Sequence, residues 1–398
     1  MARYEYVIVG GGMIADAAAK GIRELDPDSG VLILSDEADE PYTRPALSKL
    51  LWTDPSFTED EVSLGTEASG AEIRTGERVD SIDPEAKTVT VGGETIEYGA
   101  LLLATGGTPT TIDLPAGVRV VYFRTFADYR HLRALADDRP HVAVVGGSYI
   151  GTEIAAALVQ NDCRVTLVTP DGTLREKVFP AELATTFQRW FEDAGVEILP
   201  GTKVTGGSAT EDGVSLTTDG GDVLEADVVV FGLGISPNTE LAVAAGLTVE
   251  DGIVVDEHLR TSSPSVYAAG DVASYPDALL GRRRIEHVDL ARKQGRAAGR
   301  AMVGDETPFS YTPYFYSMVF GHRYEAIGSL DSSLDVVAAW AEPGEKGSLY
   351  YLDGDTVRGV LLWGNSSDAE PDARDGAREV LADPTAFSRE VLAARTLS

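Results

Sequence analysis

The residues most suggestive of chemistry are two cations in the stretch PYTRPALSKLLW, residues 41–52. Arg44 and Lys49 lie five positions apart near two prolines, in a chain with a net charge of −31 and only 33 lysines and arginines against 64 aspartates and glutamates. Two cations on a stiffened loop could hold an anionic cofactor, because guanidinium and ammonium groups both bind anions. The alternative is a surface turn with scattered charges. Taken alone, the stretch favours that alternative.

A glycine turn precedes this loop. The stretch YEYVIVGGGMIADAAAKGIREL has an apolar strand, the triplet 10–12 and an alanine-rich helix, and VLILSDE follows as a second strand ending in Asp36 and Glu37. Glycines let the backbone approach a pyrophosphate at the positive end of a helix, and the acid accepts a hydrogen bond from a ribose hydroxyl. Ala15, in the place of the third motif glycine, is small enough for close packing. The pattern predicts a dinucleotide-binding βαβ unit.

The same pattern recurs in HVAVVGGSYIGTEIAAALVQNDCRVTLVTPDG. Gly146, Gly147 and Gly151 form its turn, and Asp171 follows shortly after its second strand. Ser148 stands where a second motif glycine is expected, so we expect a looser approach to a phosphate there. Two such units in one chain need two nucleotides, or one nucleotide and one relic.

The order of elements in the first half of the chain is repeated in the second. A small β-rich segment, residues 71–103, follows the first unit, and a second one, residues 196–234, occupies the equivalent place after the second unit. From about residue 306 the sequence becomes β-rich with many tyrosines and ends in a helical pattern. At 398 residues, a multidomain architecture is expected.

Charge and composition exclude several classes of protein. The acidic excess argues against nucleic acid as a partner, because phosphate neutralisation needs a basic face. No window approaches the run of about 18 apolar residues that crosses a bilayer, and the N-terminus runs straight into a strand, so we expect a cytoplasmic protein with no membrane partner. A surface so acidic and poor in lysine is typical of halophilic microbes, whose salt screens the self-repulsion; an ordinary acidic protein is the alternative.

Sulfur chemistry and metal binding find little support in the sequence. Cys163 is the only cysteine, so an internal disulfide and a C-x-x-C motif are both ruled out. Its position just before an apolar strand favours the role of a small buried hydrophobe. The five histidines are scattered and have no cysteine nearby, so no metal site is expected.

Several stretches, in order along the chain, resemble the two-dinucleotide flavoprotein family, in particular its apoptosis-inducing-factor and oxygenase-type ferredoxin reductase branches. They cover residues 4 to about 333 and are PYTRPALSKLLW, LLLATGGTP, YFRTFADYRHL, VVGGSYIGTE, LGISPN, VYAAGDVA, LGRRRIEHVDLA and YEAIGSLDSS. The resemblance implies an α/β fold with two Rossmann-like (glutathione-reductase-type) dinucleotide-binding domains plus a small α+β C-terminal domain. The boundaries expected are residues 1–112 and 244–305 for a discontinuous FAD-binding domain, 113–243 for an NAD(P)H-binding domain and 306–398 for a C-terminal interface domain.

By this resemblance, FAD would lie on the first glycine turn. Its pyrophosphate would lie over Gly10 and Gly12, its adenosine ribose on Asp36, and its phosphate or ribityl oxygens on Arg44, while Lys49 would reach the flavin ring. Further residues implied near the cofactors are Thr105, Gly106, Arg124, Gly234, Asp271, Glu286, His287 and Tyr316. For His287 we favour positioning over proton transfer, and core packing is the alternative for Tyr316.

The second turn would hold the nicotinamide nucleotide over Gly146, Gly147 and Gly151. Glu153, on the helix after this turn, would face the nicotinamide ring. We predict an ion pair between Lys49 and Glu153 beside flavin N5, and these two are the catalytic candidates.

The choice of nucleotide depends on the adenosine end. Asp171 favours NADH, because an acid accepts the 2′-hydroxyl and repels a 2′-phosphate. Arg175 and Lys177 lie close by in the sequence and could bind a phosphate, so NADPH stays the alternative.

The resemblance implies an FAD-dependent NAD(P)H oxidoreductase that passes electrons to an acceptor such as ferredoxin. The basic run Arg282–Arg284 would either dock an acidic ferredoxin or belong to a solvated loop that supports FAD. No cysteine lies near residues 41–49, which argues against the thiol-dependent peroxidase, NADH oxidase and glutathione reductase branches. The alternative activity is a slow NADH redox sensor that acts through partner or oligomer contacts, and a homodimer fits either activity. A membrane quinone reductase lacks support in the short, mildly amphipathic C-terminus.

Overall fold

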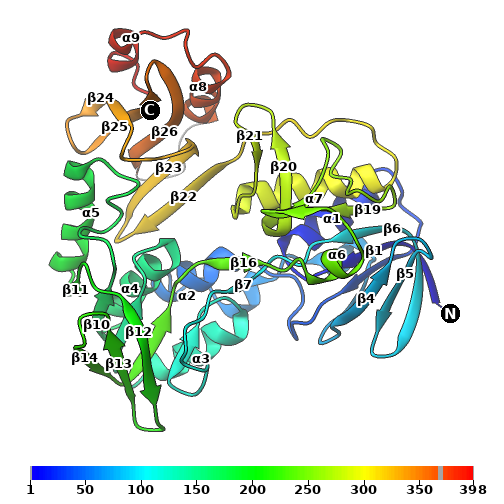
Figure 1. Ribbon diagram of the computed structural model, residues 1–398, viewed down its shortest axis with the longest axis horizontal. Coiled ribbons are helices and arrows are strands. Elements are labelled where there is room, and N and C mark those ends of the chain that lie inside the picture. Colours follow the sequence, from blue (N-terminus) through cyan, green and yellow to red (C-terminus); the bar gives the residue numbers. More distant parts are fainter. Residues whose placement is uncertain (1, 366–370, 398) are drawn as a thin grey trace. The chain divides into compact units, whose positions relative to one another are not determined.

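The structure is a computed structural model that describes residues 2–365 and 371–397. The chain divides into two compact units, each built from segments far apart in the sequence (Figure 1). Unit 1 comprises Met1–Pro45, Thr58–Thr108 and Ser236–Pro313; unit 2 comprises Ala46–Phe57, Pro109–Ile235 and Tyr314–Ser398. The division expected from the sequence, into FAD-binding, NAD(P)H-binding and C-terminal domains, stays a prediction.

A seven-stranded sheet forms the centre of unit 1, in the order β3-β2-β1-β6-β5-β4, with β19 also paired to β6. Strands β1, β2, β3, β6 and β19 run parallel to one another, whereas β5 pairs antiparallel with both β4 and β6. The bounds are β1 (Ala2–Val9), β2 (Val31–Leu34), β3 (Glu72–Arg74), β4 (Val79–Asp83), β5 (Thr88–Val91), β6 (Glu94–Leu103) and β19 (Val266–Ala268). The β-rich segment predicted over residues 71–103 is therefore part of this sheet.

Helices α1 (Met13–Arg23) and α7 (Val288–Met302) pack side by side in unit 1 (Figure 1). Gly295 and Gly299 lie four residues apart on α7, where added Cβ atoms would collide with the backbone of Ile14 and Ala18 on α1. Only glycine lets the two helix backbones come this close. Helix α1 thereby has a fixed position beneath the glycine turn that precedes it.

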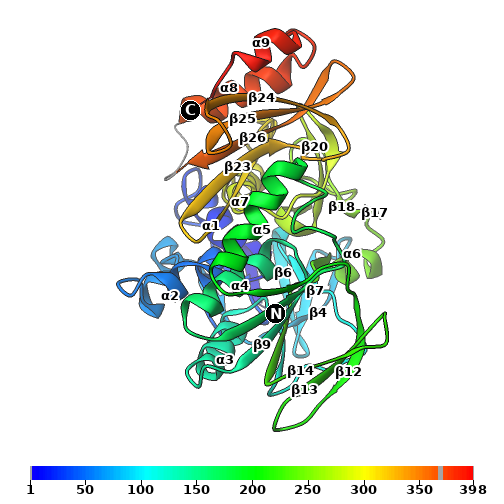
Figure 2. The ribbon, with the colours of Figure 1, turned by 90° about the vertical axis from the view of Figure 1, so that its left-hand side faces the viewer.

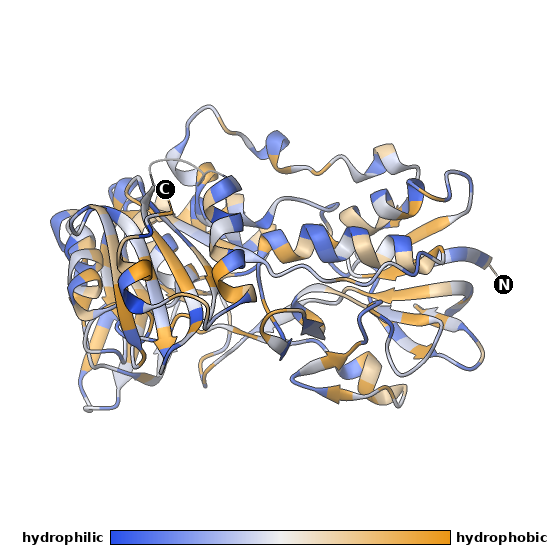
Figure 3. Ribbon diagram, turned by 90° about the horizontal axis from the view of Figure 1, so that it is seen from above, coloured by the Kyte–Doolittle hydropathy of each residue, from blue (hydrophilic) through white to orange (hydrophobic). Residues whose placement is uncertain are grey.

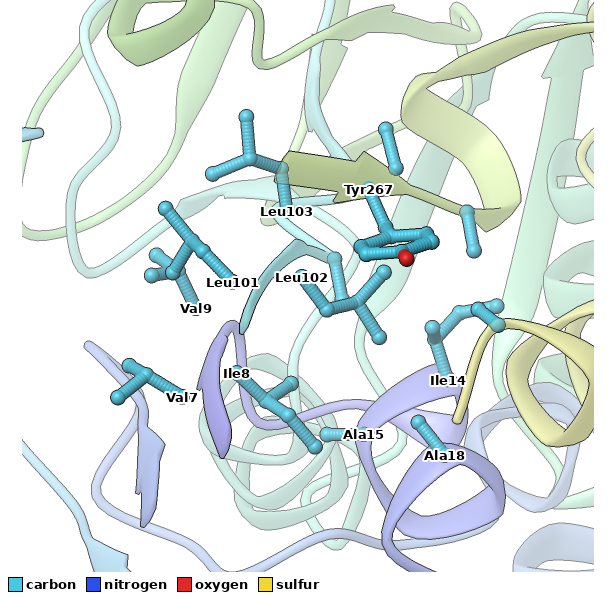
Figure 4. Close-up of a cluster of buried hydrophobic side chains, with 14 of the residues drawn as sticks. Val7, Ile8, Val9, Ile14, Ala15, Ala18, Leu101, Leu102, Leu103 and Tyr267 are labelled. Carbon is cyan, nitrogen blue, oxygen red and sulfur yellow. The ribbon is translucent and has the colours of Figure 1, made fainter. Parts of the chain in front are cut away.

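The core of unit 1 lies between α1 and the parallel strands. Figure 4 shows side chains from α1, β1, β6 and β19 that converge in one apolar cluster, all of them buried. Those labelled are Val7, Ile8, Val9, Ile14, Ala15, Ala18, Leu101, Leu102, Leu103 and Tyr267. Strands covered on both faces are expected to be apolar throughout, as the sequence VLIL of β2 is.

Smaller elements complete unit 1. A four-stranded sheet has the order β17-β18-β20-β21, and the 3-10 turn η4 connects β19 to β20. The bounds are β17 (Val249–Glu250), β18 (Gly252–Val254), β20 (Ala273–Asp277), β21 (Gly281–Arg283), η2 (Glu59–Val62), η3 (Thr66–Ser69), η4 (Gly270–Val272) and α6 (Glu240–Ala244). The turn η1 (Arg44–Ser48) and the paired strands β7 (Gly107–Pro109) and β16 (Ile235–Pro237) lie where the chain passes from one unit to the other.

Unit 2 repeats the parallel plan with a five-stranded sheet in the order β11-β10-β9-β15-β8. A three-stranded antiparallel sheet, β12-β13-β14, is inserted before β15. The bounds are β8 (Val120–Tyr122), β9 (His141–Val145), β10 (Arg164–Val168), β11 (Glu197–Leu199), β12 (Val204–Ala209), β13 (Val214–Thr218), β14 (Val223–Ala226), β15 (Val228–Phe231), α2 (Leu50–Thr53), α3 (Phe126–Ala136), α4 (Tyr149–Gln160) and α5 (Ala181–Asp193). The fold is thus the expected α/β class with two Rossmann-like units.

The C-terminal part of unit 2 is an antiparallel sheet in the order β22-β23-β26-β25-β24 (Figure 2). Helix α8 contacts β23 and β26, and α9 contacts β24. The bounds are β22 (Tyr314–Val319), β23 (His322–Gly328), β24 (Asp335–Glu342), β25 (Lys346–Asp353), β26 (Thr356–Asn365), α8 (Pro371–Ala382) and α9 (Arg389–Ala393). This is the small α+β part predicted from about residue 306.

Hydrophobic residues are concentrated in the strands of both units, whereas many residues of the loops and helices are hydrophilic (Figure 3). Among the described residues, no helix combines the length and the apolar character that crossing a membrane requires.

Candidate functional site

The first glycine turn, between β1 and α1, has room above it. Gly10 has φ +118°, and a Cβ there would collide with the carbonyl oxygen of Ala104. A Cβ at Gly12 would instead meet nothing within 4 Å. Gly12 is the N-cap of α1 and has no side chain to occupy the helix's first N–H groups, which attract anions. The turn therefore fits an anionic group such as a pyrophosphate.

The acid and the arginine expected at the first turn lie close to it in sequence and are differently engaged. Asp36 is exposed just beyond β2, whereas the next residue, Glu37, accepts hydrogen bonds from the Tyr42 hydroxyl (2.6 Å) and from Arg44 Nη2 (2.7 Å). Burial opposes the charge of Arg44, yet Tyr42, Glu37 and Asp271 together raise the pKa of its guanidinium. Arg44 is thus a charged side chain that Glu37 fixes in place. The sequence alone does not distinguish Glu37 from Asp36 as the partner of Arg44.

Thr105 and Gly106 follow β6 and are tied to Asn238. The Thr105 hydroxyl donates to the Asn238 carbonyl oxygen (2.7 Å), and Asn238 Nδ2 donates to the Thr105 carbonyl oxygen (2.9 Å). Gly106 has φ +62°, and its carbonyl oxygen accepts from the Asn238 N–H (3.0 Å). The hydroxyl of Thr105 is therefore used to fix this loop.

Asp271 lies on η4, beside a donor that sequence reasoning missed. The N–H of Gly270 donates to Gln294 Oε1 (2.6 Å), while Gln294 Nε2, on a fully buried side chain, has no hydrogen-bond partner among the described residues. A buried donor without an acceptor indicates an absent oxygen, from water or from a ligand. A single glutamine within a helical pattern gives no motif by which it could have been found.

His287 is the N-cap of α7. Burial lowers its pKa to about 4; Asp271 opposes this shift and Arg283 adds to it. The imidazole is therefore neutral near pH 7. A neutral side chain with so low a pKa suits positioning better than proton donation, and the positioning role stays a prediction.

The basic run Arg282–Arg284 is largely engaged within unit 1. Arg282 Nη1 donates to two backbone carbonyl oxygens, those of Ser274 (2.6 Å) and Val255 (3.0 Å). Arg284 Nη1 donates to Glu286 Oε1 (2.7 Å) and to the Asp271 carbonyl oxygen (3.1 Å). These contacts favour the interpretation that the run supports the loop carrying Asp271 over the interpretation that it docks a partner.

The second glycine turn, between β9 and α4, has the same backbone as the first. Gly146 also has φ +118°, and a Cβ there would collide with the Gly232 carbonyl oxygen. A Cβ at Gly151 would collide with the Gly146 carbonyl oxygen, and one at Gly147 would lie 2.7 Å from the Thr169 hydroxyl. At all three predicted glycines, a side chain would therefore collide with a neighbouring residue.

Ser148 distinguishes the second turn from the first. It is the N-cap of α4 but makes no capping hydrogen bond; its hydroxyl donates instead to the Gly232 carbonyl oxygen (2.7 Å). The first N–H groups of α4 therefore stay available to an anion.

The predicted ion pair between Lys49 and Glu153 is confirmed. Lys49 Nζ lies 2.6 Å from Glu153 Oε2, and the side chains are 12% and 4% exposed. The Ser48 hydroxyl donates to the same oxygen (2.6 Å), and the Ser317 hydroxyl donates to Oε1 (2.7 Å). The position of the pair beside flavin N5 stays a prediction.

The pair borders a cavity and an aromatic ring. The cavity, of about 200 Å³, is lined by Ser48, Lys49, Thr53, Glu153, Ala156, Ala157, Gln160, Met318, Val319, Phe320 and Gly321. Lys49 Nζ lies 5.6 Å from the ring centroid of Tyr316, and the guanidinium carbon of Arg323 lies 4.0 Å from it. Tyr316 is half-buried, and two cations lie within the range at which they stabilise its ring.

At the adenosine end of the second unit, Asp171 is paired. Lys177 Nζ lies 2.6 Å from Asp171 Oδ1, and Lys177 is 75% exposed while Asp171 is 17% exposed. The hydrogen bond to Asp171 raises the pKa of Lys177. The acid expected to select NADH is thus partly neutralised by its own chain.

The last two predicted residues lie at loops of unit 2. Arg124 is half-buried after β8, where its backbone N–H donates to Asp128 Oδ2 (3.0 Å) at the start of α3. Gly234 has φ +85° and is exposed after β15.

Cys163 is 4% exposed, and burial raises the pKa of its thiol. A buried thiol with a raised pKa is a poor nucleophile. Within residues 2–365 and 371–397, no three or more histidine, cysteine, aspartate or glutamate side chains are placed to hold a metal.

Comparison with known proteins agrees with this arrangement. The family model described as pyridine nucleotide-disulphide oxidoreductase matches residues 4–295. The ferredoxin–NAD(+) reductase component of the anthranilate 1,2-dioxygenase system of Burkholderia cepacia is 38% identical over 333 residues, which cover 81% of each chain. Apoptosis-inducing factor 1 of Dictyostelium discoideum is 32% identical over 410 residues, which cover 91% of this chain and 76% of that protein.

Among solved structures, the covalent putidaredoxin reductase–putidaredoxin complex matches with a TM-score of 0.88 and 29% identity, over 99% of this chain and 96% of that one. With the family model, the relatives and the two glycine turns in agreement, the chain belongs to the pyridine nucleotide-disulphide oxidoreductase family and is an FAD-dependent NAD(P)H oxidoreductase.

Proposed function

We propose that this flavoenzyme takes reducing equivalents from NADH and passes them to a ferredoxin-type iron–sulfur protein. The observation that carries the proposal is the repeated glycine turn, with φ +118° at both Gly10 and Gly146, which provides for two dinucleotides in one chain. FAD supplies the redox chemistry, because it accepts a hydride and can release electrons singly. The reductase relatives support the iron–sulfur acceptor.

The residues of unit 1 fit FAD. The space at Gly12 and the free N-terminus of α1 suit its pyrophosphate, and the fixed cation Arg44 suits an anionic cofactor. The buried Nε2 of Gln294 offers a donor. The other contacts proposed within unit 1 are Asp36, Thr105, Gly106, Asp271, Glu286 and His287. The roles of Lys49, Arg124, Gly234 and Tyr316 stay predictions from the family resemblance.

Lys49 and Glu153 are proposed to set the charge and geometry of the reaction. Both oxygens of Glu153 are bound, by Ser317 on one side and by Ser48 and Lys49 on the other, so the ammonium is held at one place. A fixed ammonium stabilises negative charge more effectively than a mobile one, because no reorganisation is needed when charge develops.

Electrons cannot leave this chain through a dithiol. Its only cysteine is buried, so the disulfide chemistry in the family's name has no residues to perform it here. Single-electron release to a metal centre on another protein is a route that needs no thiol.

NADH is the proposed donor, with NADPH as the alternative. Asp171 favours the 2′-hydroxyl, but Lys177 offsets its charge. Replacing Lys177 with alanine should therefore raise the preference for NADH over NADPH about fivefold, the size of one modest charge effect. An unchanged preference would show that this pair does not face the nucleotide.

Anaerobic titration of the purified yellow protein tests the function. NADH should bleach the flavin absorption at one equivalent, and oxidised ferredoxin should restore it rapidly. Bleaching without re-oxidation by any of several ferredoxins would contradict the acceptor, and absence of bleaching would contradict the donor.

A second function is favoured by the match to an apoptosis-inducing factor over 91% of this chain. In that case the reduced protein would be a slow redox sensor that acts through partner or oligomer contacts. A long-lived flavin–nicotinamide charge-transfer band with negligible turnover would support the sensor. Sedimentation of the oxidised and NADH-reduced protein would test whether a homodimer forms.

We also propose a salt-rich cytoplasmic setting, supported by the net charge of −31. Concentrated salt screens repulsion between like charges on such a surface. The unfolding temperature should rise strongly with KCl up to molar concentrations. A flat dependence would favour an ordinary acidic protein.

A further inference from the structure

The guanidinium of Arg175 is a buried cation whose binding edge has no acceptor. Arg175 is 7% exposed, and its Nε and Nη2 atoms have no hydrogen-bond partner in the described part of the chain. These two nitrogens share the edge whose parallel N–H bonds bind anions at two points. The chain has 64 acidic residues, so it is unexpected that Nε and Nη2 of Arg175 have no partner among the described residues.

The carboxylates nearest to Arg175 in the sequence are used elsewhere. Glu176 accepts the backbone N–H groups of Gly172 (3.1 Å) and Thr173 (2.9 Å). Asp171 binds Lys177. On α4, Glu153 has both oxygens bound by hydroxyls and by an ammonium. These three acids are therefore bound to donors other than the Nε–Nη2 edge of Arg175.

Aromatic side chains surround the arginine. Its guanidinium carbon lies 3.7 Å from the ring centroid of Tyr149 and 5.8 Å from that of Phe179. The Tyr324 hydroxyl, on a side chain 1% exposed, likewise has no hydrogen-bond partner of good geometry. Burial raises the pKa of Tyr324 against the opposing charge of Arg175, so this hydroxyl stays protonated and remains a donor.

The arrangement costs stability unless something compensates it. A buried cation without a counter-ion and buried N–H groups without acceptors are both unfavourable, and the Tyr149 ring face offsets only part of this. Arg175 also has φ +64°, a left-handed conformation that residues other than glycine seldom adopt. Such strain collects where a side chain must hold a particular position.

We propose that the Nε–Nη2 edge of Arg175 binds a small inorganic anion, with the Tyr324 hydroxyl as a further donor. Two unpaired guanidinium N–H groups and a hydroxyl suit an anion, and their burial suits an ion without a bulky organic part. Chloride is the probe we choose. The proposal does not depend on the identity of the electron acceptor.

Thermal unfolding of the FAD-loaded protein in potassium chloride and in potassium gluconate, at equal ionic strength, tests the site. An anion bound only by the folded state lowers the unfolding constant about tenfold at ten times its dissociation constant. We expect a saturable rise in unfolding temperature with chloride, which Arg175→Met abolishes. Arg189→Met, the same change at an exposed position of α5, should keep the rise.

A crystal soaked in bromide provides the second measurement, because the anomalous signal locates the ion. We expect a peak at the Nε–Nη2 edge of Arg175. Equal unfolding temperatures in the two salts, a chloride effect that survives in Arg175→Met, or no bromide at this edge would each overturn the proposal. Displacement of the bromide by NADH would also overturn it, because the edge would then belong to the nucleotide.

Should Arg175→Met fail to fold, Tyr324→Phe keeps the ring and removes the second donor. It should weaken chloride binding several-fold, seen as a higher midpoint of the saturation curve. An unchanged midpoint would contradict the role of Tyr324 in the site.

Discussion

The two glycine turns use one backbone but leave different space above it. Gly10 and Gly146 have the same φ, and each faces a carbonyl oxygen at the end of a neighbouring strand. At the third position of the triplet, Gly12 has open space, whereas Ser148 carries a hydroxyl bound to the Gly232 carbonyl oxygen. The difference therefore lies in one side chain rather than in the turn itself.

This difference matches the two kinds of ligand that the family needs. A cofactor that stays bound profits from a turn with no side chain between it and the helix N-terminus. A donor that must leave after each reaction can be bound less tightly, and Ser148 takes up part of the space. We infer that the first turn is built for retention and the second for exchange.

The largest effect should come from filling the first turn. Gly12→Val places a branched side chain in the open space, so FAD affinity should fall by about a hundredfold or more, roughly 3 kcal/mol. The measurement is the flavin content of the purified protein and its recovery on adding FAD. Gly117→Val, also in open space but away from either turn, is the matched control and should keep its flavin. A Gly12→Val protein with full flavin content would contradict the inferred difference between the two turns.

The next effect concerns the buried ion pair of unit 2. Lys49→Met leaves Glu153 charged with only the Ser48 and Ser317 hydroxyls, which should cost about 3 kcal/mol of unfolding free energy. Lys20→Met removes a partner from the pair with Asp16, where Lys20 is 48% and Asp16 10% exposed. It should cost less than Lys49→Met, because water reaches the Lys20 ammonium and the Thr66 hydroxyl still donates to Asp16 (2.8 Å). Urea unfolding measures both, and rapid mixing with NADH should show slower flavin reduction in Lys49→Met.

Equal stability losses in Lys49→Met and Lys20→Met would contradict the importance of burial. A double-mutant cycle with Glu153→Gln would sharpen the result, because two residues in direct contact should not give additive losses.

Both turns could be predicted from the sequence because the information is local. Strand, glycines and helix follow one another within about 25 residues, and Gly10 and Gly146 are each needed by a contact within their own unit. The Lys49–Glu153 pair was predicted through the family resemblance rather than through local pattern. The seryl hydroxyls that hold Glu153 could not be found this way, since Ser48 and Ser317 lie 105 and 164 residues from it in the sequence.

Other misses have the same cause. Glu37 binds Arg44, and Gln294 accepts from the Gly270 N–H of η4, although neither differs in residue type from many others in the chain. For the basic run Arg282–Arg284, the sequence leaves open whether it docks a partner or supports FAD; Arg282 and Arg284 bind backbone carbonyl oxygens and acids of unit 1. Charge in a sequence does not show which charges the fold satisfies internally.

A pH effect of intermediate size is expected at His287 in unit 1. Its folded pKa of about 4 lies below the unfolded value near 6.5, so the unfolded state binds more protons between these pH values. Stability should therefore fall as the pH falls from 6.5 to 4, by about 1 kcal/mol for a half-buried ring. His287→Gln should lose this part of the pH dependence in chemical unfolding. An identical curve for the variant would show that burial does not hold the ring neutral.

The smallest effect should follow from making the second turn like the first. Ser148→Gly removes both the Cβ and the hydroxyl bound to Gly232, so a phosphate can come closer to α4, and NADH affinity should rise about threefold, some 0.6 kcal/mol. The cost to α4 should be a few tenths of a kcal/mol, because Ser148 makes no capping hydrogen bond. Ser148→Ala keeps the Cβ and separates the two contributions. Spectral titration gives the affinities, and flavin content should stay unchanged. Weaker NADH binding in Ser148→Gly would show that the hydroxyl preorganises the turn for its ligand, and the inference of one turn for retention and one for exchange would then be wrong.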